Sequence, residues 1–84
     1  MVLDMKRYIL KCDDKEYDLT KTELKMLGLL SDNYFHSTKE LRKFTGVWSI
    51  CRLLAILKEK VPEIKIVSKK IYGYILINKI EIGE

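Results

Sequence analysis

Two adjacent lysines, Lys69 and Lys70, are the residues of this chain best suited to binding a polyanion. They lie between two strand-like segments, 64–68 and 72–77, so they would form the tip of a β-hairpin, with Tyr72 beside them and Lys65 near. A lysine ammonium binds phosphate as a point charge, and a narrow AT-rich minor groove attracts inserted cations. We therefore expect the tip to contact double-stranded DNA. The alternative is a solvated turn whose lysines protect an exposed strand edge.

Two helix N-termini are further candidate phosphate sites. Each starts with the pattern of a capping box, in which a hydroxyl and a glutamate satisfy free backbone amides. Free amides, hydroxyls and a lysine together suit an anion, although capping alone would explain both patterns. The candidate contacts are Thr20, Lys21 and Thr22 in the first set and Ser37, Thr38 and Lys39 in the second.

The chain has few residues that could catalyse a reaction or bind a cofactor. The chain has one histidine, His36, which we expect at the surface, and no glycine-rich phosphate loop or metal-ligand cluster. Two cysteines, Cys12 and Cys51, are too few for a disulfide framework and indicate reduced thiols in the cytoplasm. No apolar run is long enough to span a membrane. We expect neither an enzyme, nor a cofactor, nor a membrane protein.

The elements that must position these residues can be read from the hydropathy pattern. The 84 residues suffice for one domain, spanning 1–84, and the net charge of +4 weakly favours a polyanionic partner. Strand patterns flank a turn within 6–19, and apolar stripes of helical spacing follow. The predicted order is an α+β fold with a hairpin at 6–19, helices at 20–31, 37–45 and 49–61, and a second hairpin at 64–82.

This order resembles a winged helix-turn-helix domain, and within that superfamily the output domain of OmpR/PhoB-type response regulators. The resemblance rests on Leu19-Thr20-x-x-Glu23-x-x-x-Leu27, Ser37-x-x-x-Leu41, Ile66-x-Ser68 and Gly73-Tyr74-x-Leu76, in this order and spacing. It implies a DNA-binding domain whose third helix enters the major groove and whose second hairpin is a wing. The loop between the second and third helices is only Gly46-Val47-Trp48, which departs from the family's long loop. We expect Trp48 to be a packing anchor there.

The helix at 49–61 has an unusual outward face for a DNA reader. With Ile50 facing the core, helical spacing turns Cys51, Arg52, Ala55, Ile56 and Glu59 outward. Only Arg52 is a strong donor for base edges, with Ser49 at the helix start as a second candidate. Two interpretations stay open for Cys51, Ala55 and Ile56: sparse contact with DNA, or a homodimer interface.

These observations predict a small, sequence-preferring protein that binds double-stranded DNA as a homodimer, with AT-rich DNA expected at the wing. Its role would be that of an accessory factor at a plasmid or phage origin, with a relaxase or similar nucleoprotein partner, or of a transcriptional regulator. A resemblance to the small TcpK-type origin-binding proteins of conjugative plasmids fits the first role. The alternative is a winged helix module that binds another protein and no DNA.

Overall fold

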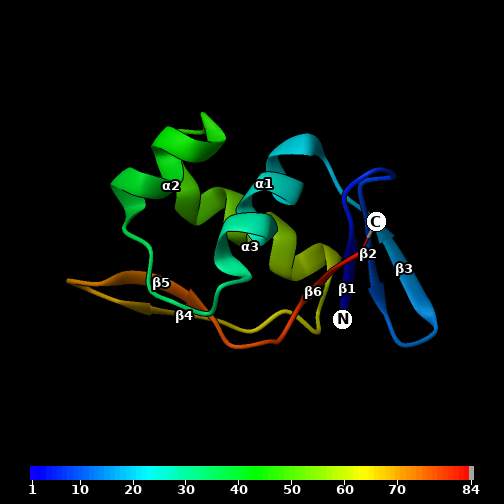
Figure 1. Cartoon of the computed structure of the whole chain (residues 1–84). Coiled ribbons are helices and arrows are strands. Elements are labelled where there is room, and N and C mark those ends of the chain that lie inside the picture. Colours follow the sequence, from blue (N-terminus) through cyan, green and yellow to red (C-terminus); the bar gives the residue numbers. More distant parts are fainter. Residues whose placement is uncertain (84) are drawn as a thin grey trace.

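The computed structural model describes residues 1–83 and has the predicted α+β layout, with N-terminal strands, three helices and a C-terminal hairpin (Figure 1). This arrangement is that of a winged helix. The strands are β1 (Val2–Asp4), β2 (Ile9–Cys12), β3 (Lys15–Asp18), β4 (Ile66–Lys69), β5 (Gly73–Leu76) and β6 (Glu81–Gly83). The helices are α1 (Lys21–Leu30), α2 (Thr38–Thr45) and α3 (Ile50–Lys60).

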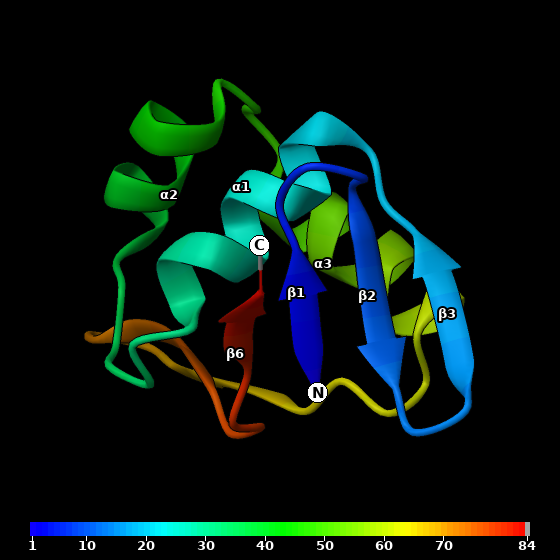
Figure 2. The same ribbon diagram turned by 45° about the vertical axis from the view of Figure 1, so that its right-hand side comes forward.

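The four-stranded sheet has the order β3-β2-β1-β6 and lies at one end of the molecule (Figure 2). The hairpin β2–β3 turns at Asp13, whose φ of 54° suits a tight turn. β1 pairs antiparallel with β2 and parallel with β6, so the two ends of the described chain lie in one sheet. β1 has only three residues, and its partner β6 lies about eighty positions away in the chain. No local sequence pattern therefore predicts β1.

The C-terminal hairpin is shorter than predicted. Its strands β4 and β5 end at Leu76, and the segment expected to extend the hairpin to residue 82 instead joins the other sheet as β6. Asn78 explains the change of direction. Its side-chain oxygen accepts a hydrogen bond from the Lys65 amide at 2.6 Å, and its side-chain nitrogen donates to the Glu63 carbonyl at 2.9 Å. These bonds replace the next rungs of the hairpin ladder.

The helices begin at the expected caps, but only one capping box is complete. Thr20 accepts from the Glu23 amide, and the Glu23 carboxylate accepts from the Thr20 amide at 2.9 Å. Ser37 accepts from the Glu40 amide at 3.1 Å, whereas the Glu40 carboxylate turns to His36. Gly46 ends α2 in the left-handed conformation, with φ of 75°.

The core lies between the sheet, α1 and α3, and consists mainly of leucine and isoleucine side chains. Its fully buried members include Leu3 and Leu10 of the sheet, Leu27 and Leu30 of α1, and Leu57 of α3. α2 contributes one buried leucine, Leu41, whereas Phe44 is 49% exposed and does not share its face. None of the helices within residues 1–83 is long and apolar enough to cross a membrane.

The wing, β4 and β5, is joined to the segment before α2. The amide of His36 donates to the carbonyl of Tyr74 at 2.8 Å, and the amide of Tyr74 donates back to His36 at 2.9 Å. Gly73 is needed at this contact, because a Cβ there would overlap the backbone of His36 and Ser37. The wing is therefore fixed against the start of α2.

Candidate nucleic-acid interface

The wing tip presents the two predicted lysines to solvent. Lys69 ends β4 and Lys70 begins the turn; both are exposed, and no carboxylate of residues 1–83 lies within 4.0 Å of their ammonium groups. Tyr72 is 61% exposed and its ring lies against Phe35, with centroids 5.6 Å apart. The tip thus has two unpaired charges on a turn that an aromatic contact supports.

Lys65 lies at the opposite end of the wing from these lysines. It precedes β4, and its carbonyl accepts from the Ile77 amide at 2.9 Å where the hairpin starts. Lys69 lies four positions after Lys65 along an extended chain, a distance of about 13 Å. Lys65 is exposed but cannot act with the tip on the same phosphate.

The N-terminus of α2 lies beside the wing tip. A shallow pocket of ≈ 180 Å³ is lined by Thr38 on α2 and, on the wing, by Ser68, Lys69, Lys70, Gly73 and Tyr74. Ser37 and Lys39 flank Thr38 and are exposed. The second set of predicted phosphate contacts and the lysines of the tip therefore form one cluster, although they are some thirty residues apart in the chain.

His36 holds this cluster to the rest of the fold, and the expectation that it lies at the surface is wrong. It is 7% exposed, with Nε2 2.9 Å from Asp32 and Nδ1 2.9 Å from Glu40. Burial alone would lower the pKa of His36, but the hydrogen bonds and charges of Asp32 and Glu40 outweigh it and raise the pKa. Since both ring nitrogens face carboxylates, the doubly protonated, cationic ring fits this site best.

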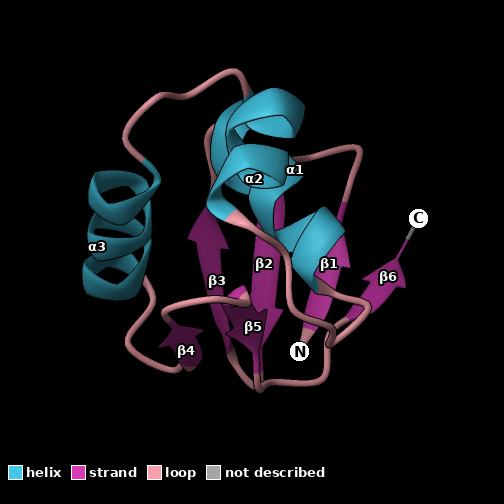
Figure 3. Cartoon of the chain, turned by 90° about the vertical axis from the view of Figure 1, so that its left-hand side faces the viewer, coloured by secondary structure: helices cyan, strands magenta, loops and turns pink. Residues whose placement is uncertain are grey.

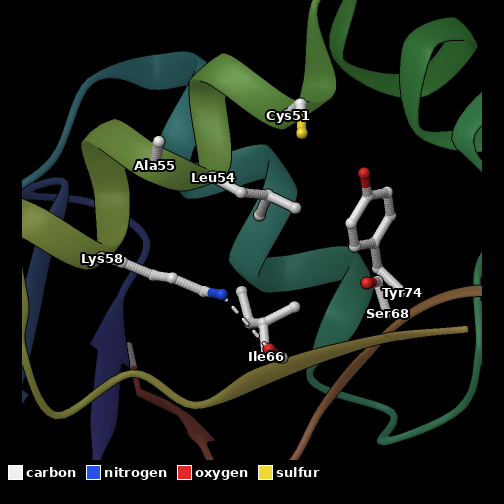
Figure 4. A pocket seen from close by; sticks show the side chains of 7 residues that line it. All are labelled: Cys51, Leu54, Ala55, Lys58, Ile66, Ser68 and Tyr74. Atoms are coloured by element: carbon white, nitrogen blue, oxygen red, sulfur yellow. Dashed lines mark hydrogen bonds between the residues drawn. The ribbon is translucent and has the colours of Figure 1, made fainter.

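The outward face of α3 meets the other side of the wing. Figure 4 shows a pocket of ≈ 290 Å³ between them, lined on α3 by Cys51, Leu54, Ala55 and Lys58 and on the wing by Ile66, Ser68 and Tyr74. Lys58 Nζ donates to the Ile66 carbonyl at 3.3 Å. Burial, together with the neighbouring Cys51 thiol, raises the pKa of Tyr74, whose hydroxyl points toward α3.

Ser68 and Tyr74 line both pockets, so three elements form one continuous surface. We call it the wing–helix surface: the outward face of α3 around Cys51, Ala55 and Lys58, the wing, and the N-terminus of α2. Lys58, Ser68 and Tyr74 also belong to this surface, although no sequence motif predicted them there. Lys58 had a usable signal, because it follows Cys51 by seven positions and so shares its helical face.

The remaining α3 candidates are exposed as predicted from helical spacing. Arg52, Ile56 and Glu59 all reach solvent, and Ile56 is 47% exposed. Ser49 occupies the N-cap position of α3, but its hydroxyl makes no capping hydrogen bond. It is therefore available to an external acceptor or donor, as is the guanidinium of Arg52.

Thr20, Lys21 and Thr22 are not part of the wing–helix surface. They begin α1 directly after β3, and Figures 1 and 2 place this end of α1 at the side of the molecule away from the wing tip. Thr20 is also occupied by its capping bonds with Glu23. A DNA segment lying on the wing would not reach this group without bending around the domain.

Trp48 is not the packing anchor that we expected. It is 78% exposed, with the guanidinium of Arg42 4.3 Å from its ring centroid and Arg42 Nε donating to its carbonyl at 2.7 Å. The loop between α2 and α3 is held by these contacts, and the indole lies on its outside.

No family model, curated protein or solved structure matches this chain. The residues described above are therefore what points to its function.

Proposed function

We propose that this protein binds double-stranded DNA through the wing–helix surface, with a preference for certain sequences. The observation that carries the proposal is the pair Lys69 and Lys70 at the wing tip, exposed and without carboxylate partners in residues 1–83, beside the N-terminus of α2. Ammonium groups and free helix amides are both phosphate ligands. Their proximity suits them to consecutive phosphates of one backbone.

The dimensions of α3 support a role in the major groove. Its 11 residues make a rod about 16 Å long, and a helix fits a groove about 12 Å wide. Arg52 and Ser49 at its start are the groups that could reach base edges, while Ala55 and Ile56 suit thymine methyl groups. Because α3 has so few donors, much of the sequence specificity would come from the width of the groove. A narrow groove has a stronger negative potential, which attracts the wing lysines.

A homodimer built on Cys51 and Ala55 competes with this use of the surface. Both residues line the pocket that α3 shares with the wing, so a second copy seated there would cover the groups assigned to DNA. We therefore assign Cys51, Ala55 and Ile56 to the DNA-facing surface. Dimerisation remains part of the proposal, because a single small domain with few reading groups has a small footprint.

Two biological roles suit such a protein. One is an accessory factor that helps a relaxase or another nucleoprotein complex assemble at a plasmid or phage origin; the other is a small transcriptional regulator. The loop between α2 and α3 is only Gly46–Ser49, too short to offer a large contact to a polymerase. This favours a role in which the protein occupies or shapes DNA rather than recruiting a polymerase.

The test is a titration of labelled duplex DNA at several salt concentrations. Each phosphate that the protein neutralises adds about 0.9 to the slope of log affinity against log salt. A slope of about 3 or more, with tighter binding to AT-rich than to GC-rich duplexes, is expected from the two wing lysines and the α2 N-terminus. A flat dependence on salt with every duplex would reject DNA binding.

A protein-interaction module is the second candidate. It is favoured by exposed apolar side chains at the wing tip and in the α2–α3 loop: Ile71 is 87% exposed and Trp48 78% exposed. In that case Lys69 and Lys70 would only keep the wing edge soluble. If this candidate is right, the wild type does not bind DNA, and replacing both lysines changes nothing in a DNA-binding assay.

A further inference from the structure

We propose that the exposed stripe of α1 is a self-association surface, on which a second copy of this chain packs across a two-fold axis. The stripe runs at helical spacing from the exposed Lys25 through the half-buried Gly28 and Leu29 to the exposed Asp32, which follows the C-cap Ser31 of α1. It forms the floor of an apolar groove of ≈ 480 Å³, walled by Met5, Phe44 and Ile82.

The walls of this groove are apolar side chains that the fold leaves uncovered. Phe44 on α2 is 49% exposed, Ile82 on β6 is 51% exposed, and Met5 between β1 and β2 is 39% exposed. They come from three separate elements and converge on one helix. Single exposed apolar residues need no explanation, but a contiguous group around a groove is typical of an interaction site.

Gly28 gives the groove its open floor. Glycine in the interior of a helix costs about 1 kcal/mol relative to alanine, and nothing inside this domain requires it. Its φ is not positive, and an added Cβ would meet only Met5 Cε, at an ordinary 3.9 Å. What the missing side chain does provide is room for another backbone or side chain to approach α1 closely.

The charges on the stripe select a second copy as the occupant. Lys25 lies three residues before Gly28, and Asp32 lies three residues after Leu29, so the two charges are equally far from the centre of the stripe. If a second α1 packs antiparallel with the axis between Gly28 and Leu29, Lys25 of each copy faces Asp32 of the other. The same axis brings Phe44 against Phe44 of the second copy and Ile82 against Ile82.

Asp32 can serve this contact and its contact with His36 together. Its side chain is 43% exposed, and a carboxylate has about four acceptor positions, so a second cation can approach from the groove. A parallel arrangement would place Lys25 against Lys25, which disfavours it. The antiparallel pairing is therefore the one that this charge pattern allows.

The proposed dimer leaves the wing–helix surface free. Figures 2 and 3 place β6 and α3 on opposite sides of the molecule, so a partner seated over α1 and β6 does not cover α3. The inference goes beyond DNA binding and does not depend on it. A protein that dimerises through α1 could have another ligand on its other side.

The experiment measures the mass of the full chain by sedimentation, without DNA, from about 1 to about 100 µM, the range in which small interfaces dissociate. The wild type is expected to reach twice the 9.9 kDa of one chain. Phe44→Glu should raise the dissociation constant at least about tenfold, because the carboxylate would be buried against its mate. The matched control is Ile56→Glu on α3, where the exposure is nearly equal, and this variant should stay dimeric.

A second variant separates dimer loss from misfolding. Gly28→Gln improves helix propensity, and the space above Gly28 accommodates its Cβ within one chain, so the monomer should unfold no more easily than the wild type. It fills the groove and should nevertheless be monomeric. A wild-type chain that stays monomeric throughout the range overturns the proposal, and so does dissociation by Ile56→Glu but not by Phe44→Glu.

Discussion

Lys60 Nζ lies 2.6 Å from Oε1 of Glu23, and this ion pair joins the first turn of α1 to the last turn of α3. The Glu23 side chain is 2% exposed and also accepts from the Thr20 amide, so the buried carboxylate has both a cation and a backbone donor. The pair ties α1 to the helix that carries Arg52.

Removal of the cation should destabilise the domain. Lys60→Ala leaves the buried Glu23 carboxylate with its backbone donor alone, which is expected to cost about 1–3 kcal/mol of unfolding free energy. Urea unfolding followed by circular dichroism measures this. Lys58→Ala, which removes only a hydrogen bond to a carbonyl, is the control and should cost less than half as much. Equal losses of unfolding free energy in both variants would show that the ion pair contributes no more than the Lys58 hydrogen bond.

The His36 cluster predicts a pH dependence of stability. Its folded pKa is above the ordinary 6.5, since Asp32 and Glu40 outweigh the effect of burial. A raised pKa contributes stability that is fully present below pH 6.5 and is lost as pH rises through the folded pKa. Asp32 acts in the opposite direction: burial raises its pKa, but the hydrogen bonds from His36 and the Tyr34 amide, together with the charge of His36, lower it more, so its contribution is lost only as pH falls below 3.8.

The unfolding free energy of the wild type should therefore fall as the pH rises above 6.5 and through the raised pKa of folded His36. His36→Gln should be less stable at pH 6 and should show a flatter profile across the same range. Unfolding in urea at several pH values tests both statements. If the wild type and His36→Gln had parallel profiles, the histidine would not carry the pH dependence.

The contact between Gly73 and His36 predicts a strong effect of a single methyl group. Gly73→Ala would place a Cβ on the His36 carbonyl at a φ of 99°, so the wing must leave the start of α2. We expect a loss of about 2–3 kcal/mol in stability, together with weaker DNA binding. Gly46→Ala is the control: its φ is 75°, but its Cβ would meet nothing within 4 Å, so only the backbone cost of about 1 kcal/mol applies.

The fold could be predicted from the sequence where the signals are local. Thr20-x-x-Glu23 and the apolar spacing in α1 and α3 mark helices, and Gly46 marks the end of α2. β1 and β6 could not be predicted, because three-residue strands that pair in parallel owe their existence to neighbours distant in the chain. The path of β6 depends on the side-chain bonds of Asn78, which no periodicity reveals.

The candidate site was predicted in its parts but not in its arrangement. Lys69 and Lys70 follow from the hairpin pattern, and Thr38 from the helix start, yet their proximity depends on backbone pairing between His36 and Tyr74. The surface position of His36 was wrongly predicted because Asp32 and Glu40, each four residues away, make burial of a charged ring favourable. Trp48 was wrongly placed because its stacking partner, Arg42, leaves the indole outside.

The salt dependence of binding to one AT-rich duplex shows whether the wing lysines neutralise DNA phosphates. The proteins to compare are the wild type, the wing variant Lys69→Ala/Lys70→Ala, Arg52→Ala, and the control Lys6→Ala/Lys15→Ala. The control removes the same charge as the wing variant, but from exposed positions near the other sheet. The wing variant should bind at least about tenfold more weakly, with a slope smaller by about 2, while Arg52→Ala loses less and the control keeps the wild-type slope. An unchanged slope in the wing variant, or an equal loss in the control, would contradict the account.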